Sequence, residues 1–210
     1  AIEDLAYIGM DFRKDYSVPF SKPFIPTIGK YGKNWITLVS ASKAFSFPGP
    51  RCAIAIISPN INEKKYTNLK KFCDREQFGH AFSLGGLYVT TSGTSHTAQY
   101  GLAKMLEAAT SGEFNFIEIT SEYGRRAEKV KEIFLKYGFE QVYKKDMDET
   151  VGNGFYLTMS YPGYGGNDLM LELLRYGIST ITLKSTGSVR HEGLRVCISF
   201  IGLDEMPTLE

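Results

Sequence analysis

The stretch Ser40-Ala41-Ser42-Lys43-Ala44-Phe45-Ser46-Phe47-Pro48-Gly49-Pro50-Arg51 decides how this chain is interpreted. It follows a run of β-type residues from Ile36 to Val39, so it begins where a strand is predicted to end. A hydroxyl at Ser40, an amine at Lys43 and a guanidinium at Arg51 are therefore concentrated at one strand end. The Pro-Gly-Pro sequence before Arg51 predicts a turn that can bring this arginine back toward the lysine.

These residue types suit one kind of ligand. A lysine amine can form a Schiff base with an aldehyde, and a hydroxyl and a guanidinium can hold a phosphate. Pyridoxal phosphate carries both groups. Phe45 and Phe47 make the surroundings of Lys43 apolar, which favours the free amine that this chemistry requires. A lone lysine after a strand is usually a solvated charge, so the hypothesis depends on the whole pattern.

The stretch resembles the lysine signature of the class I/II aminotransferases, the fold-type I pyridoxal-phosphate enzymes. That signature reads Ser-x-Ser-Lys-x-Phe followed by Pro-Gly-x-Arg, and both parts occur here between Ser40 and Arg51. The resemblance implies that Lys43 carries the Schiff base with the cofactor and moves the Cα proton of the substrate. It also implies that Ser40 and Arg51 hold the cofactor phosphate.

A second motif lies upstream, where Asp4-Leu5-Ala6-Tyr7 resembles the Asp-x-Ala-Tyr of the same family. The resemblance implies that Asp4 pairs with the pyridine nitrogen and that Tyr7 hydrogen-bonds the 3-oxygen of the ring. Glu3 is the competing acid. Adjacent strand residues point to opposite faces, and the spacing to Tyr7 favours Asp4.

A third element is the alternating run from Leu194 to Phe200. Leu194, Val196, Ile198 and Phe200 are expected on one buried face, with Arg195 on the other. The resemblance implies that Arg195 binds the substrate α-carboxylate, for which a guanidinium fork is well suited. Arg190, in the preceding loop, is the alternative.

Hydrophobic periodicity predicts an α/β chain. Strands are expected at 35–40 and 52–57, and the apolar run 53–57 is typical of a strand covered on both faces. Helices are expected at 69–77 and between Ser95 and Gly112. The secondary structure of 84–91 stays undecided, because Gly85 and Gly86 weaken any helix there. Further strands are predicted at 139–143, 155–160, 178–183 and 194–200, with a helix at 168–176.

A long helix ending at Gly138 is also predicted. Its apolar face is formed by residues at helical spacing, namely Ala127, Val130, Ile133, Phe134 and Tyr137. Its solvated face carries four cations, namely Arg125, Arg126, Lys129 and Lys131.

The resemblance refines this fold class to the C-terminal part of an aspartate-aminotransferase-like fold. Residues 1–112 would be a partial large domain that binds pyridoxal phosphate, and 113–210 the small C-terminal α/β domain. The chain starts without methionine on strand-like residues, which predicts that it is a portion of a longer protein. The resemblance implies that the phosphate loop and the aromatic residue that stacks on the cofactor lie upstream of these residues. We therefore expect these residues alone to be inactive.

Composition excludes several other classes of function. A net charge of +1 over 210 residues offers no electrostatic basis for a nucleic-acid partner, and no apolar run is long enough for a membrane span. Three scattered cysteines, Cys52, Cys73 and Cys197, fit a reducing compartment, and we expect a cytoplasmic protein. His80, His96 and His191 lack metal-ligand spacing, so no metal is expected.

The reaction implied by the resemblance is exchange of an amino group between an amino acid and a 2-oxo acid, by a homodimer. Two alternatives keep the cofactor and the lysine, namely a β-lyase and an acyl-CoA condensing synthase. A third is a catalytically inert portion of the fold. Nothing in the sequence selects the side chain of the substrate.

Overall fold

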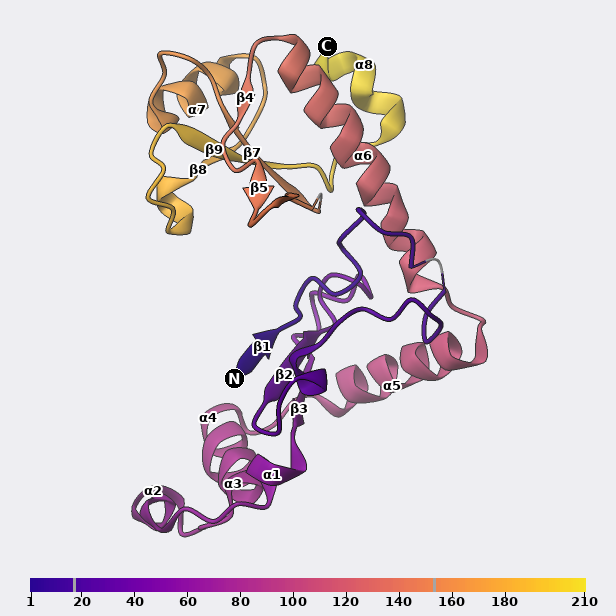
Figure 1. Cartoon of the computed structure of the whole chain (residues 1–210), viewed down its shortest axis with the longest axis vertical. Helices are drawn as coiled ribbons and strands as arrows, with labels where there is room; N and C mark the ends of the chain where they lie inside the picture. The colour runs from indigo at the N-terminus through magenta and orange to yellow at the C-terminus, as the bar shows by residue number, and fades with distance from the viewer. Residues whose placement is uncertain (17, 153) are drawn as a thin grey trace. The chain divides into compact units, whose positions relative to one another are not determined.

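The computed structural model describes residues 1–16, 18–152 and 154–210, which form a mixed α/β structure (Figure 1). The α/β class predicted from the sequence is confirmed. Two compact units are present: Ala1–Gly9 with Tyr16–Ile117, and Met10–Asp15 with Glu118–Glu210. The division of the chain into a large domain over 1–112 and a small domain over 113–210 stays a prediction.

A three-stranded sheet organises the first unit. Its strands are β1 (Ile2–Asp4), β2 (Ile36–Ser40) and β3 (Ala53–Ile57), in that order. β2 runs parallel to β1 and antiparallel to β3. The two strands predicted in this region are therefore present, each beginning one residue later than expected.

Coverage of β3 on both faces was wrongly predicted. Ile54 packs against the core, but Ala53, Ala55 and Ile56 are exposed. The physical reason is that β3 is an edge strand, and only one face of this short sheet is covered by the described residues.

Short helical segments follow β3 and lead into one long helix. They are α1 (Pro59–Asn62), η2 (Thr67–Leu69), α2 (Lys70–Cys73), α3 (Phe78–His80), the π-helical segment η3 (Ala81–Tyr88) and α4 (Val89–Thr91), and the long helix is α5 (His96–Ser111). A further 3-10 turn, η1 (Ile28–Lys30), lies between β1 and β2. The helix predicted over 69–77 stops early, because Asp74 adopts a left-handed conformation with a φ of 48°.

Gly85 explains why segment 84–91 is helical despite its two glycines. A Cβ atom at Gly85 would lie 2.3 Å from the Cβ atom of Cys73, at the end of α2. The helical run can approach α2 this closely only with glycine at that position. Packing therefore overrides the weak helix propensity that left this segment undecided.

α5 provides the core of the first unit. Its buried residues Ala98, Leu102 and Ala109 pack against the segment after β2, where Ala41, Ala44 and Phe45 are buried. The helix ends at Gly112, with a φ of 85°, as predicted. Ser95 occupies the N-cap position, but its side chain makes no capping hydrogen bond.

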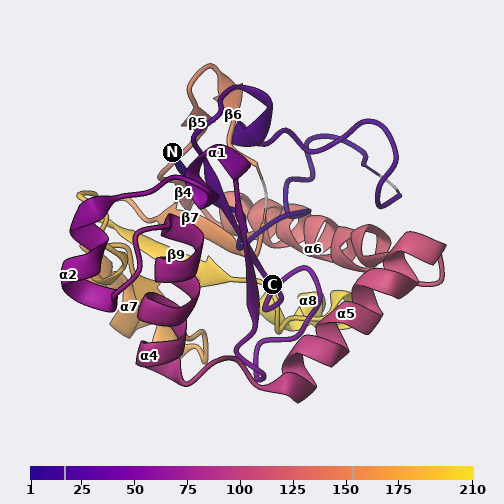
Figure 2. The ribbon, with the colours of Figure 1, turned by 90° about the horizontal axis from the view of Figure 1, so that it is seen from below.

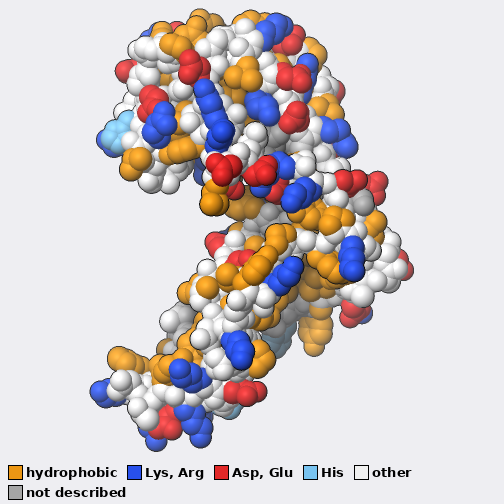
Figure 3. All heavy atoms as spheres, viewed as in Figure 1, with side chains coloured by type: hydrophobic (Ala, Val, Ile, Leu, Met, Phe, Trp, Pro, Cys, Tyr) orange, Lys and Arg blue, Asp and Glu red, His pale blue; other side chains and the backbone are white. Residues whose placement is uncertain are grey.

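Apolar side chains remain exposed on the first unit (Figure 3). They lie on the sheet and on the helical run after β3, and include Ile2, Leu38, Phe72, Tyr88 and Val89. The described residues therefore cover the hydrophobic surface of this unit only in part.

The second unit is built on an antiparallel sheet with the order β4-β7-β9-β8. These strands are β4 (Glu140–Gln141), β7 (Tyr156–Ser160), β9 (Gly193–Cys197) and β8 (Ile181–Thr182), and a hairpin of β5 (Lys145–Asp146) and β6 (Glu149–Thr150) precedes β7. The helical elements are α6 (Phe116–Lys136), α7 (Gly166–Arg175), α8 (Met206–Leu209), η4 (Lys184–Thr186) and η5 (Leu203–Glu205).

One face of this sheet carries the core of the second unit. Alternate residues of β7 and β9 are buried against α6, α7 and α8, namely Leu157, Met159, Leu194 and Val196, with Ile198 directly after β9. α8 lies beside α6 (Figure 2), and its Met206 belongs to the same cluster. The opposite face of the sheet therefore carries the remaining residues of β7 and β9.

Two aromatic positions in this unit were wrongly predicted to be buried. Phe200 is 92% exposed, because β9 ends at Cys197 and the chain turns at Ser199. Tyr137 is also exposed, because it follows the last residue of α6 and precedes Gly138, whose φ of 85° redirects the chain. Strands β4 and β8 are likewise shorter than predicted.

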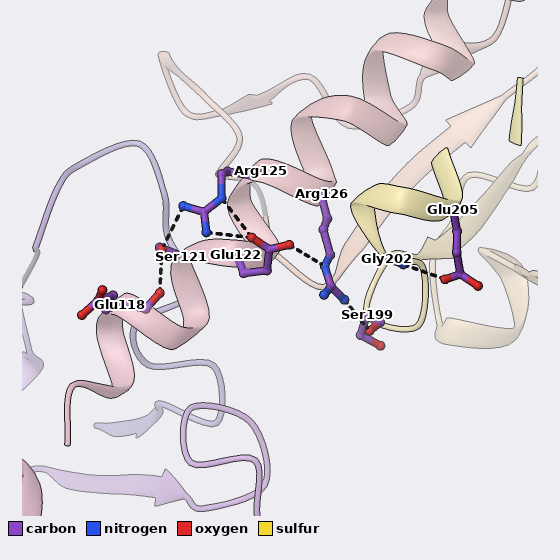
Figure 4. Close-up of polar contacts among 8 residues, drawn as sticks. All are labelled: Glu118, Ser121, Glu122, Arg125, Arg126, Ser199, Gly202 and Glu205. Atoms are coloured by element: carbon purple, nitrogen blue, oxygen red, sulfur yellow. Dashed lines mark hydrogen bonds and ion pairs between the residues drawn. The ribbon is translucent and has the colours of Figure 1, made fainter. Parts of the chain in front are cut away.

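An ion-pair network on α6 holds the segment after β9 (Figure 4). Glu122 accepts hydrogen bonds from Arg125 Nη2 at 2.7 Å and from Arg126 Nε at 3.2 Å. Arg126 Nη1 donates to the carbonyl oxygen of Ser199 at 3.2 Å. Arg126 is therefore a structural link as well as part of a basic surface, and its i,i+4 spacing from Glu122 was the available sequence signal.

We expect replacement of Met159 by alanine to destabilise the second unit by about 2–5 kcal/mol, because this fully buried side chain would leave a cavity. Leu171→Ala is the control, since Leu171 is 54% exposed on α7. Urea unfolding followed by circular dichroism measures the free energy of unfolding of both variants. Equal losses in the two variants would contradict the packing described for this sheet.

The network also predicts a pH dependence. Hydrogen bonds from Arg125 and then Arg126 lower the pKa of Glu122 below its ordinary value of 4.5. Its stabilising contribution is therefore present above about pH 4.5 and is lost as the pH falls through the lower folded-state pKa. Because the pairs are partly exposed, we expect Glu122→Gln to lower the free energy of unfolding by less than about 1 kcal/mol at neutral pH.

The measurement is the difference in unfolding free energy between parent and Glu122→Gln, at pH 7 and near pH 3. We expect this difference to shrink at the lower pH. Glu132→Gln is the control, because Glu132 forms only a longer, exposed pair with Lys129, at 3.6 Å. A difference for Glu122→Gln that stays constant with pH would exclude the assigned ion pairs.

Candidate functional site

Strand direction places the candidate residues of the first unit at one edge of its sheet, namely the edge formed by the carboxyl ends of β1 and β2 and the start of β3. Asp4 ends β1 and Ser40 ends β2, and the two strands are parallel. Ala53, the first residue of β3, pairs with Ser40. The segments carrying Tyr7, Lys43 and Arg51 therefore all leave or enter the sheet at this edge.

Lys43 lies in a compact turn that the core holds in place. The amide of Ser46 donates to the carbonyl oxygen of Lys43 at 3.0 Å, and the amide of Phe47 donates to that of Ala41 at 3.1 Å. Ala41 and Ala44, on either side of Lys43, are buried. The side chain is half-buried, and its Nζ lies 5.6 Å from the centroid of the Tyr7 ring. The structure thus brings together Tyr7 and Lys43, which are distant in sequence.

Ser40 and Arg51 offer donors suited to an anion. The Ser40 hydroxyl oxygen accepts a hydrogen bond from the amide of Ser42 at 3.1 Å, so its own O–H can donate elsewhere. Arg51 is exposed and has a left-handed backbone, with a φ of 55°. Its Nη1 donates to the carbonyl oxygen of Pro48 at 3.0 Å, across the predicted turn.

The two neighbouring acids of β1 have different surroundings. Glu3 accepts hydrogen bonds from the Thr37 hydroxyl and from the amide of Ile28, both at 3.0 Å. Glu3 therefore connects the sheet to η1. Asp4 is exposed, and one of its oxygens accepts from the amide of Ala6 at 2.9 Å. These contacts favour Asp4 as the acid that is available to a ligand.

Arg195 belongs to the second unit, where it lies in β9 opposite Thr158 of β7 and Ile181 of β8. Its Cζ is 4.2 Å from the centroid of the Tyr156 ring. Its Nε is buried and has no hydrogen-bond partner among the described residues. No carboxylate within the described ranges forms an ion pair with this arginine.

Arg190, the alternative, is already paired. Its Nε donates to Glu192 Oε1 at 2.6 Å. A backbone amide and the Arg190 guanidinium lower the pKa of Glu192 from its ordinary value. The charge of Arg190 is therefore balanced within its own loop, which leaves Arg195 as the better candidate for an external carboxylate.

Histidine, cysteine and acidic side chains form no cluster in the described part of the chain that could hold a metal ion. No described helix has the length and apolar character needed to cross a membrane.

The sequence matches no protein-family model and no curated protein sequence. Solved structures do match. An aspartate aminotransferase double mutant from Thermus thermophilus shares 18% identity with a TM-score of 0.67, over 99% of this chain and 45% of that one. An α-aminoadipate aminotransferase from the same organism, complexed with N-(5'-phosphopyridoxyl)-L-leucine, shares 16% identity with a TM-score of 0.66. The match covers 98% of this chain and 46% of that one.

A multiple substrate aminotransferase from Thermococcus profundus gives the same result, with 15% identity and a TM-score of 0.68 over 98% of this chain and 44% of that one. This chain thus spans less than half the length of the structures it matches. At these identities the likeness concerns the fold alone. The chain has the aspartate-aminotransferase-like fold over the portion it spans, as expected for a C-terminal portion.

Proposed function

We propose that this chain forms part of a pyridoxal-phosphate-dependent aminotransferase that exchanges an amino group between an amino acid and a 2-oxo acid. The observation that carries the proposal is the convergence of Asp4, Ser40, Lys43 and Arg51 at one edge of the first sheet. The aminotransferase-like fold supports it. A homodimer, as the family resemblance implies, is part of the proposal.

The donor set fits pyridoxal phosphate. The cofactor needs an amine for its aldehyde, a carboxylate for its protonated ring nitrogen, and hydrogen-bond donors for its phosphate. Lys43, Asp4, and the pair Ser40 and Arg51 offer these groups in turn. When bound, the cofactor would supply an electron sink for the charge that develops at the substrate Cα.

Lys43 would also move the proton. Once the amino group of the substrate has replaced it on the cofactor, its Nζ would be free to accept the Cα proton of the amino acid and to donate a proton later in the exchange. The contact with the Tyr7 ring restricts the positions of this amine, and the buried alanines beside it fix its backbone. Tyr7 would donate through its hydroxyl to the 3-oxygen of the cofactor, the role that the resemblance implies.

Arg195 would bind the carboxylate that amino acids and 2-oxo acids share. Because its Nε is buried, the two Nη groups are the donors left for a bidentate contact. A β-lyase or a condensing synthase would use the same residues. Transamination is preferred because the matching structures are aminotransferases.

The first test concerns Lys43. We expect pyridoxal phosphate followed by borohydride to label this lysine, as mapped by peptide mass spectrometry, and expect Lys43→Ala to lose that label. Lys64→Ala is a matched control, because Lys64 lies over the Tyr66 ring at 5.1 Å but outside the candidate site. Label spread evenly over surface lysines would argue against the cofactor assignment.

The second test concerns the two arginines. We expect Arg195→Gln to weaken binding of pyruvate by about 10- to 100-fold, since charge-assisted hydrogen bonds to the carboxylate are lost. Arg190→Gln should leave binding unchanged, because Arg190 is paired with Glu192. Titration followed by NMR gives both dissociation constants. The reverse ranking would transfer the carboxylate role to Arg190.

A further inference from the structure

Arg195 lies on the sheet face opposite the helices of the second unit. Leu194 and Val196, its neighbours in β9, are buried in the core, so the Arg195 side chain takes the other face. Tyr156 pairs with Cys197, two residues along β9, and so lies diagonally across from Arg195 on the same face.

The contact between these two side chains is unusually close for this chain. The Cζ of Arg195 lies 4.2 Å from the Tyr156 ring centroid, whereas Arg126 lies 5.7 Å from the ring of Tyr123. A guanidinium at this distance over an aromatic face is attracted by the electron density of the ring. The ring thus supports Arg195 where no carboxylate of the described residues does.

The Nε of Arg195 is buried and has no hydrogen-bond partner among the described residues. A buried unsatisfied donor is destabilising, and the attraction of the Tyr156 ring for the guanidinium offsets part of that cost. The backbone of Tyr156 is held by the pairing of β7 with β9, which runs from Tyr156 to Ser160.

A cavity of about 350 Å³ lies beside Tyr156. Its lining includes Tyr156 and Thr158 of β7, with Gln141, Tyr143, Lys145 and Asp146, and does not include Arg195. The cavity therefore borders the aromatic member of the pair rather than the guanidinium.

We propose that Tyr156 is the positioning residue for Arg195, and that its ring holds the guanidinium with the Nη groups available to the carboxylate of an amino acid or 2-oxo acid. This inference rests on the carboxylate role proposed above for Arg195. It adds the reason why an arginine without an ion-pair partner keeps one position.

The test uses the full chain labelled with ¹⁵N-arginine, and the Nε–H signal of Arg195, assigned by its loss in Arg195→Lys. We expect this buried N–H to exchange slowly with water in the parent and in Tyr156→Phe, which keeps the ring. In Tyr156→Leu the exchange should accelerate and the signal should shift. Tyr164→Leu is the control, because Tyr164 contacts Tyr161 and not Arg195.

Titration with pyruvate completes the test. Loss of the ring should raise the pyruvate dissociation constant by about 3- to 30-fold in Tyr156→Leu, with no change in Tyr156→Phe. If circular dichroism shows that Tyr156→Leu is unfolded, Tyr156→Met replaces it. Unchanged exchange and unchanged affinity in the ring-less variant would overturn the proposal.

The two proposals fail in different ways. If pyruvate does not shift the Nε–H signal of Arg195 in the parent, the carboxylate role of the proposed function is overturned. The positioning role of Tyr156 is then overturned with it. If pyruvate binds through Arg195 but the leucine variant matches the phenylalanine variant, the proposed function stands and only the role of Tyr156 is overturned.

Discussion

The pairing of β2 with β1 on one side and β3 on the other is the constraint on which the candidate site depends. Parallel pairing places the ends of β1 and β2 at the same edge, and antiparallel pairing returns β3 to that edge. Three segments that are separate in the sequence therefore converge there. Burial of Ala41 and Ala44 beneath Lys43 then fixes the one segment whose amine must be placed accurately.

Register has the same importance in the second unit. In β9, alternate residues enter a core shared with α6, α7 and α8, and Arg195 takes the opposite face. A shift of one residue would bury the guanidinium and expose Leu194 and Val196. The hydrophobic residues of β9 thus position the arginine, although none of them would contact a ligand.

Electrostatics distinguishes arginines that sequence alone treats alike. Arg190 is paired with Glu192, and Arg126 donates hydrogen bonds to both Glu122 and the Ser199 carbonyl oxygen. Arg195 has an aromatic ring and no carboxylate among the described residues. A charge balanced within the protein gains little from an added anion, whereas an unbalanced one gains a strong hydrogen-bonded partner. Partner choice, more than residue type, therefore marks Arg195 as the candidate carboxylate site.

The sequence by itself determined the α/β class, the approximate positions of most strands, the ends of the long helices at Gly112 and Gly138, and the candidates Lys43 and Arg195. These features depend on local periodicity and on motifs read along the chain. Only the tertiary structure decided that β3 is an exposed edge, that Phe200 lies outside the core, and that Tyr156 stacks on Arg195. Burial and partner choice depend on which distant segments meet, and that information is set by strand pairing rather than by any local pattern.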